Sequence, residues 1–294
     1  MKQVLITGAN GFLGQHLTLF LATEQFKVTA TGRGNCRIDE KKGYEYLSVD
    51  LTDESAIQNM VAQLQPSIII HNAAMSKPDE CENDKPACIL NNVTATEYMV
   101  KAANNIGAKL IYISTDFIFG ENGPHEIDAI PNPLNFYGKS KLMAEELVKN
   151  TANNYAIVRP VFIYGPTLQG IRPSFLHWVK NNVEAGKTIK VVSDQLRMPT
   201  FVTDICKGLQ TIVLDDKQGV YHLAGKDILS PYEMAIAVAD LLGLDKKLII
   251  SVTAATFAEP VVRAKKSGLK IDKSIQELNY QPVSFNEGVM LTFK

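Results

Sequence analysis

This chain of 294 residues has almost no net charge, few cysteines and no long apolar run. The formal net charge is -1 at neutral pH, so electrostatics gives no reason to expect nucleic acid or an anionic membrane as a partner. No apolar run is long enough to span a bilayer or to resemble the core of a signal peptide. We therefore expect a cytoplasmic protein that binds neither nucleic acid nor membrane.

Four cysteines are present, and their spacing shows no pair typical of a metal site or of a disulfide framework. They are Cys36, Cys81, Cys88 and Cys206, which we interpret as free, mostly buried thiols in a reducing compartment. The acidic stretch 79–84 is interpreted as a solvated loop. We predict no metal site.

Short β-branched runs alternate with helical patterns in the first half of the chain. The apolar run 67–70 is typical of a parallel sheet covered on both faces. This alternation predicts right-handed crossovers and a Rossmann-type, doubly wound α/β fold. The predicted strands are 4–7, 28–31, 46–49, 68–71, 110–114 and 156–159, and the predicted helices are 11–22, 54–64, 87–105 and 136–150.

The rhythm changes after Tyr164-Gly165-Pro166, which predicts a second, smaller and mainly helical lobe. Helical patterns cover 175–184, 203–214 and 231–242, with short strands at 189–192 and 220–223. We predict a first domain over 1–165, with roughly 190–222 returning to its sheet. The second lobe then comprises 166–189 and 223–294, and no flexible linker separates the two.

The first predicted strand runs directly into a glycine-rich turn that opens a helix. A tight turn and a close approach of backbone to pyrophosphate both require residues without a Cβ atom. The helix N-terminus would then face the pyrophosphate with its free N–H groups. Strand, turn and helix together predict a dinucleotide site, in contrast to a simple glycine-rich loop. The predicted contact residues are Gly8, Asn10, Gly11, Phe12, Leu13 and Gly14.

The second strand ends at Thr31-Gly32-Arg33, where an NAD-selective site usually carries an acid. Arg33 is suited instead to pair with the 2′-phosphate of NADP(H). The alternative reading is a solvated surface arginine. We predict NADP(H) as the cofactor, with NAD(H) as the alternative.

Among ten tyrosines, only Tyr137 has a lysine, Lys141, four residues later. That spacing places both side chains on one helix face. The helix follows the strand that ends at Thr115, and doubly wound sheets assemble ligand sites at such strand ends. The alternative is an amphipathic helix with a half-buried tyrosine and a solvated lysine.

This set of groups suits a carbonyl reductase. Tyr137 would protonate the alkoxide that forms when hydride attacks a carbonyl carbon, and Thr115 would hydrogen-bond the substrate oxygen. Lowering the pKa of a phenol from about 10 to about 7 requires roughly 4 kcal/mol. An ammonium at about 4 Å supplies about that much at an effective dielectric constant of about 20, so Lys141 is expected to provide most of this shift.

With these motifs, the sequence resembles the extended short-chain dehydrogenase/reductase family. The resemblance rests on the run 7–14, Asp50-Leu51, His71-Asn72-Ala73-Ala74, Asn92-Val93, Ser114-Thr115-Asp116, Tyr137 with Lys141, and Arg159 followed by Tyr164-Gly165-Pro166. It implies that Asp50 and Leu51 lie beside the adenine. It also implies that Ala73 and Ala74 line the cofactor path and that Asn92 supports the active-site end of the sheet.

Within this family the sequence is most similar to the dTDP-4-dehydrorhamnose reductases. The resemblance implies NADP(H)-dependent reduction of a 4-keto group on a nucleotide sugar, in a homodimer. The first domain would bind the dinucleotide and the second lobe the substrate. Thr115, Asp116 and Tyr137 would contact the sugar, as would Phe162, which stands where those reductases usually have tryptophan.

Three other functions stay open at this stage. A nucleotide-sugar epimerase uses the same tyrosine and lysine, although it generally retains NAD. A non-catalytic, NADP-binding regulatory subunit of another enzyme can keep the whole set. A reductase of apolar carbonyl compounds fits less well with the polar pair Asp194-Gln195. A dehydratase is disfavoured because Phe117, where its second acid would stand, is not acidic.

Overall fold

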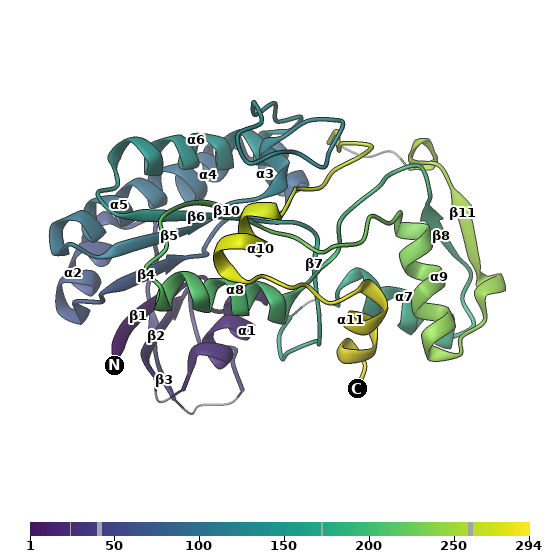
Figure 1. Ribbon diagram of the computed structural model, residues 1–294, viewed down its shortest axis with the longest axis horizontal. Helices are drawn as coiled ribbons and strands as arrows, with labels where there is room; N and C mark the ends of the chain where they lie inside the picture. The colour runs from purple at the N-terminus through teal and green to yellow at the C-terminus, as the bar shows by residue number, and fades with distance from the viewer. Residues whose placement is uncertain (24, 40–42, 172, 258–260) are drawn as a thin grey trace.

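The computed structural model describes residues 1–23, 25–39, 43–171, 173–257 and 261–294. Its main feature is a seven-stranded parallel sheet in the order β10-β6-β5-β4-β1-β2-β3 (Figure 1). This order confirms the predicted doubly wound α/β fold. The strands are β1 (Lys2–Thr7), β2 (Phe26–Gly32), β3 (Tyr44–Ser48), β4 (Ile68–His71), β5 (Lys109–Ile113), β6 (Tyr155–Pro160) and β10 (Gly219–Leu223).

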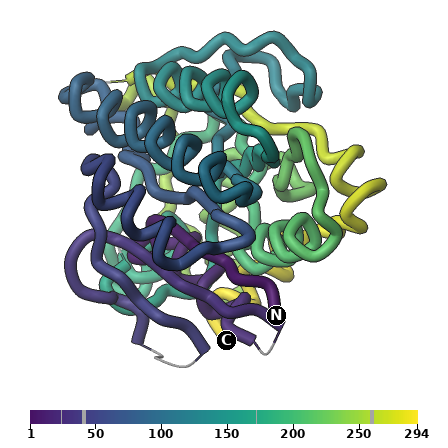
Figure 2. The backbone as a smooth tube through the Cα atoms, turned by 90° about the vertical axis from the view of Figure 1, so that its left-hand side faces the viewer, coloured from purple at the N-terminus to yellow at the C-terminus, as the bar shows by residue number. Residues whose placement is uncertain are grey.

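Helices cover both faces of this sheet, because its central strands are apolar on both sides. Buried side chains of α1, α8 and α10 pack on one face, and those of α2, α5 and α6 pack on the other. Figure 2 shows the green α8 and the blue and teal helices on opposite sides of the strands. The helices are α1 (Phe12–Leu21), α2 (Glu54–Leu64), α5 (Ala95–Ile106), α6 (Phe136–Thr151), α8 (Val202–Leu214) and α10 (Asp272–Leu278).

The second lobe lies beside the sheet and has its own apolar core (Figure 1). Three helices, α7 (Phe175–Glu184), α9 (Pro231–Leu242) and α11 (Phe285–Thr292), contribute to it. Parallel strands β8 (Ile189–Val192) and β11 (Ile249–Val252) form a separate two-stranded sheet. The remaining short elements are β7 (Ile163–Tyr164) paired with β9 (Thr200–Phe201), and the 3-10 turns η2 (Asp116–Ile118), η3 (Lys246–Leu248) and η4 (Ala254–Thr256).

One topological expectation needs correction. The segment 190–222 rejoins the sheet domain only from α8 onward, since α8 packs on the main sheet and β10 pairs with β6, whereas β8 pairs with β11 in the second lobe. The physical reason is that β8 alternates buried and exposed residues, so it suits a sheet with one covered face. A central parallel strand would be buried on both faces.

The interpretation of 79–84 as a solvated loop is wrong. Those residues belong largely to α3 (Pro78–Asn83), followed by α4 (Lys85–Ile89) and a π-helical turn η1 (Leu90–Thr94). Pro78 at the first helical position and acids in the first turn favour this short helix. It buries Cys81, and Cys88 and Cys206 are also buried free thiols, as predicted. Across the described residues no helix is long and apolar enough to cross a membrane.

Candidate functional site

A single cleft of about 910 Å³ lies where β1, β2, β4, β5 and β6 end. Its volume is near the upper end for small-molecule sites, so it has room for a ligand much larger than a sugar. Most of the sequence-predicted site residues line it: Gly8, Asn10, Gly11, Phe12, Leu13, Arg33, Asp50, Leu51, Ala73, Ala74, Thr115, Asp116, Tyr137, Lys141 and Phe162. Gly14 and Asn92 lie outside the lining.

The glycine-rich turn leaves no space for side chains. Gly8 has a φ of +67°, and a Cβ atom there would lie 2.7 Å from the Cα of Ala73. A Cβ atom on Gly14 would lie 2.2 Å from the Gly8 carbonyl oxygen, so Gly14 brings α1 against the turn. The N-cap of α1, Gly11, offers no side-chain cap, which leaves first-turn N–H groups available to an anion. This cradle fits a pyrophosphate.

Asn10 fixes the loop that follows β2. Its Nδ2 donates to the carbonyl oxygens of Arg33 and Asn35, at 3.2 and 3.0 Å, and to the Tyr46 hydroxyl at 2.9 Å. Its Oδ1 accepts from the backbone N–H of Arg37 at 2.9 Å. Arg33 and Arg37 are thereby held at the same end of the cleft, which both line. Two guanidinium groups there suit a phosphate.

Asp50 and Leu51 lie at the same end of the cleft as the arginines. The Asp50 carboxylate accepts from the N–H and the hydroxyl of Thr52, and these bonds lower its pKa. Its hydrogen-bonding capacity is therefore partly used within the loop. Leu51 is buried and forms part of the apolar wall beside α2.

Tyr137 and Lys141 extend from the first turns of α6, which Asn135 caps by accepting from the N–H of Gly138 at 3.0 Å. Both side chains are buried and line the cleft. The Lys141 ammonium donates to the Ile113 carbonyl oxygen at 2.8 Å and lies 4.1 Å from the centre of the Tyr112 ring. The Thr115 hydroxyl, the Tyr137 phenol and the Lys141 ammonium therefore belong to the lining of one cleft.

The pKa of the phenol differs from the expectation. Burial raises the pKa of Tyr137 above its usual value, and the Thr115 hydroxyl only partly opposes this. Burial also lowers the pKa of Lys141 to about 7. The sequence argument counted the attraction of one ammonium but omitted the cost of desolvating both groups. The phenol is therefore held in its protonated form, which is the form that donates a proton.

Asp116 and Phe162 form the wall beyond the phenol. The Thr115 hydroxyl donates to the Asp116 carboxylate at 3.2 Å, and burial raises the pKa of Asp116 to about 6. Phe162 has a φ of +34°, a strained conformation for an aromatic residue, and its carbonyl oxygen accepts from Thr200 at 3.0 Å. Its ring lies edge-on to that of Phe175 in the second lobe.

Asn92 does not line the cleft but hydrogen-bonds to segments that support it. Its side chain accepts from the Met75 N–H at 2.7 Å and donates to the Met75 carbonyl oxygen at 3.1 Å. It also donates to the Ser140 hydroxyl at 2.9 Å, which joins the loop after β4 to α6. The lining residues that sequence reasoning missed include Arg37, Asn91 and Ser174.

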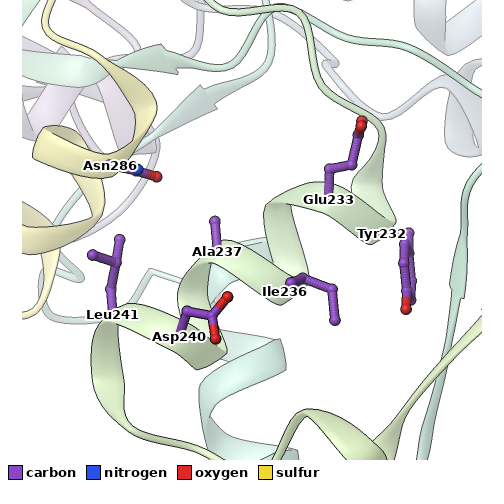
Figure 3. Close-up of a pocket in the computed structure, with 7 residues that line it drawn as sticks. All are labelled: Tyr232, Glu233, Ile236, Ala237, Asp240, Leu241 and Asn286. Atoms are coloured by element: carbon purple, nitrogen blue, oxygen red, sulfur yellow. The ribbon is translucent and has the colours of Figure 1, made fainter.

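A smaller hollow of about 310 Å³ is lined by side chains of α9 and by Asn286 of α11 (Figure 3). Its apolar side chains are Ile236, Ala237 and Leu241. Glu233, on its rim, is engaged in the N-terminal cap of α9, and Asp240 forms an ion pair with Lys246. It therefore brings together no reactive groups. Within the part of the chain that the structure describes, no three His, Cys, Asp or Glu residues cluster as a metal site would require.

Comparison with known proteins gives a family match along the chain. The family model described as RmlD substrate binding domain matches residues 1–294. Methionine adenosyltransferase 2 subunit beta from Bos taurus is 35% identical over 272 residues, which cover 90% of this chain and 78% of that protein. The spore coat polysaccharide biosynthesis protein SpsK from Bacillus subtilis is 28% identical, covering 98% of this chain and 96% of that protein.

Solved structures give the same fold. The dTDP-4-dehydrorhamnose reductase from Bacillus anthracis, determined in complex with NADP, has a TM-score of 0.86 and 28% identity, and the alignment covers 100% of this chain and 99% of that one. The dTDP-4-dehydrorhamnose reductase from Yersinia enterocolitica also has a TM-score of 0.86 and 28% identity, over 99% and 100% of the two chains.

Proposed function

The chain belongs to the RmlD substrate binding domain family, within the extended short-chain dehydrogenases/reductases, and from that premise we propose that it reduces the 4-keto group of a nucleotide sugar with NADP(H). The observation that carries the proposal is one continuous cleft. It has a phosphate cradle and two arginines at one end, and Thr115, Tyr137 and Lys141 at the other. The similar Bacillus anthracis reductase was crystallised with NADP, which supports this cofactor.

The proposed cofactor would lie along the strand ends. Gly8, Gly11 and the open N-terminus of α1 would hold the pyrophosphate, and Arg33 and Arg37 would hold the 2′-phosphate. When bound, the reduced nicotinamide supplies the hydride that attacks the keto carbon. The cleft fits this group because Gly8 and Gly11 line it without side chains, so the backbone of the turn can approach a pyrophosphate closely.

The protein's own groups would manage the proton. Tyr137 donates its phenolic proton to the oxygen of the former keto group, and the hydroxyl of Thr115 hydrogen-bonds the same oxygen. The phenolate that remains is stabilised by the positive charge of Lys141, which is buried where water screens little. Asp116 would contact a sugar hydroxyl, since its carboxylate lies beside Thr115 at the cleft wall.

We also propose that the two parts of the chain bind different ligands. The sheet domain, residues 1–165 with β10, would bind the dinucleotide. The second lobe would contribute substrate contacts from Ser174, which lines the cleft at the start of α7. The polar side chains in the lining of the cleft, among them Ser76, Lys77 and Asn91, favour a sugar nucleotide over an apolar carbonyl compound.

A second candidate function is an NADP-binding regulatory subunit of another enzyme. Several relatives named methionine adenosyltransferase 2 subunit beta are 31% to 35% identical to this chain. An intact cleft does not distinguish a reductase from a regulatory subunit, because a regulatory protein can keep a dinucleotide site. Turnover separates them.

The test is loss of NADPH absorbance with purified protein and dTDP-4-dehydrorhamnose. We expect turnover, and we expect Tyr137→Phe to reduce kcat by about 10²- to 10⁴-fold, because general acid catalysis contributes about that much. Tyr98→Phe is the matched control, since Tyr98 lies on α5 outside the cleft lining. Tight NADPH binding without turnover on this or any other keto sugar would overturn the reductase proposal and favour the regulatory one.

A further inference from the structure

A buried ion pair lies directly behind the proposed catalytic lysine. Glu145 and Arg159 are 0% and 2% exposed. The guanidinium of Arg159 donates to both carboxylate oxygens of Glu145, at 2.9 and 2.7 Å. Tyr137, Lys141 and Glu145 follow one another at intervals of four residues on α6, so they share one helix face. Positive and negative charges therefore alternate from Arg159 through Glu145 to Lys141.

Lys141 needs such a partner. A buried ammonium loses most of its hydration, and the direct contacts of this one are a neutral carbonyl and an aromatic ring. Those contacts do not offset the loss, because burial brings the pKa of Lys141 down to about 7. Glu145 acts in the opposite direction and favours the charged form. A helix spacing of four residues places the two side chains within roughly 6 Å.

We propose that Glu145 is a positioning residue whose carboxylate, kept ionised by Arg159 and by Lys149 at 3.3 Å, holds the positive charge on Lys141 and sets the upper pH limit of the site. The charge on Lys141 is a property of the chain itself. Only its consequence for turnover rests on the proposed function. The ion pair thus has a role beyond packing, which matters because buried ion pairs contribute little net stability in general.

Other ionisable groups around Lys141 do not replace Glu145. His71 of β4 is kept neutral: its Nδ1 lies 2.9 Å from the Thr7 hydroxyl and its Nε2 lies 3.1 Å from that of Thr96. Burial lowers the pKa of His71 to about 3. Tyr112 of β5 and Tyr137 both have raised pKa values and stay neutral.

The thiols of α3 and α4 are the remaining groups near Lys141. Burial and interaction with Cys88 keep Cys81 protonated, because both raise its pKa. Interactions with Cys81, Ser140 and Asn92 lower the pKa of Cys88. A Cys88 thiolate would add to the effect of Glu145, so Cys88→Ala is included as a separate variant.

The experiment is a pH titration of protein labelled with ¹³Cε-lysine, followed by NMR without substrate or cofactor. Lys141→Arg assigns the resonance. We expect a wild-type midpoint near pH 7 and a midpoint lower by about one pH unit or more in Glu145→Gln, from the Coulomb interaction of charges at this separation. Glu146→Gln is the matched control, because Glu146 is exposed on the same helix, and it should leave the midpoint unchanged.

Glu145→Gln leaves Arg159 as an unpaired buried cation, which can itself impair folding. The double variant Glu145→Gln with Arg159→Met removes both charges and should also titrate below wild type. Midpoints equal to wild type in the Glu145 variants would overturn the proposal, and a decrease seen only in Cys88→Ala would assign the effect to the thiol in place of Glu145. If the reductase proposal holds, the alkaline limb of kcat against pH moves down with the midpoint. If it fails, the NMR titration still decides the role of Glu145.

Discussion

Replacing Arg33 and Arg37 with alanine should remove most of the preference for NADPH over NADH. Both guanidinium groups are exposed and line the cleft, and across the described residues neither takes part in an ion pair. Their positions are fixed through backbone contacts with Asn10, so truncating either side chain leaves the loop intact. The substitution therefore tests the charges themselves.

The size of the expected change in affinity depends on how far solvent screens the two exposed guanidinium groups. A hydrogen bond between charged groups contributes about 1.5 to 3 kcal/mol in a protected site, but solvent screens an exposed pair to about 1 kcal/mol or less. Two arginines then contribute about 2 kcal/mol, which corresponds to about a 30-fold change in Kd. NADH lacks the 2′-phosphate, so its Kd should change less than about 3-fold.

The assay is titration of intrinsic fluorescence with NADPH and with NADH, in wild type and in the double variant, at low and at moderate salt. Lys27→Ala, which removes an exposed charge outside the cleft lining, controls for the change in net charge. The salt dependence of NADPH binding should weaken in the double variant. An equal loss of affinity for both dinucleotides, or no loss for either, would refute the assignment of these arginines.

Two further predictions concern the stability of the fold. Gly14→Ala should abolish dinucleotide binding and lower Tm, because its Cβ atom would lie 2.2 Å from the Gly8 carbonyl oxygen. Gly107→Ala, with nothing within 4 Å of the added Cβ atom, should cost only the strain of its φ of +68°, about 1 to 2 kcal/mol, and should leave binding intact. His222 has a pKa lowered to about 4 by burial, so stability of up to about 3 kcal/mol should be lost as pH falls from about 6.5 to about 4. In His222→Gln, denaturant titrations should show a smaller acid-induced loss, and an unchanged loss would contradict this reasoning.

The sequence predicted the fold well where local patterns and tertiary burial agree. Helices 54–64, 175–184 and 231–242 were predicted with the bounds that the structure has, since each begins after an Asp or Ser N-cap residue. The prediction of a loop over 79–84 was wrong because an acidic composition is typical of both loops and the first turns of helices. Pro78 and the first-turn acids favour a helix locally, and burial of Cys81 against Tyr137 of α6, which the sequence does not reveal, adds to them.

The candidate site was predictable where residues follow strand ends, and unpredictable where a loop folds back. Arg33 directly follows β2, so a rule about strand ends locates it. Arg37 has no such rule, because its position depends on the hydrogen bond from its N–H to Asn10. The prediction of a lowered pKa for Tyr137 failed for a different reason. A sum of charge–charge interactions made from sequence does not include the cost of desolvating the buried phenolate.

The buried charges bear on whether a chain of this kind catalyses or only binds. A dinucleotide can be held by exposed arginines and backbone N–H groups, which cost the fold little. Lys141, Glu145 and Arg159 are instead ionisable side chains that are almost wholly excluded from solvent, at 2%, 0% and 2% exposure. Burying charges in this way is expensive, and apolar residues of similar volume would often be at least as stable. In the reaction proposed above, proton transfer from Tyr137 would leave a phenolate, and a positive charge on the buried Lys141 would stabilise it.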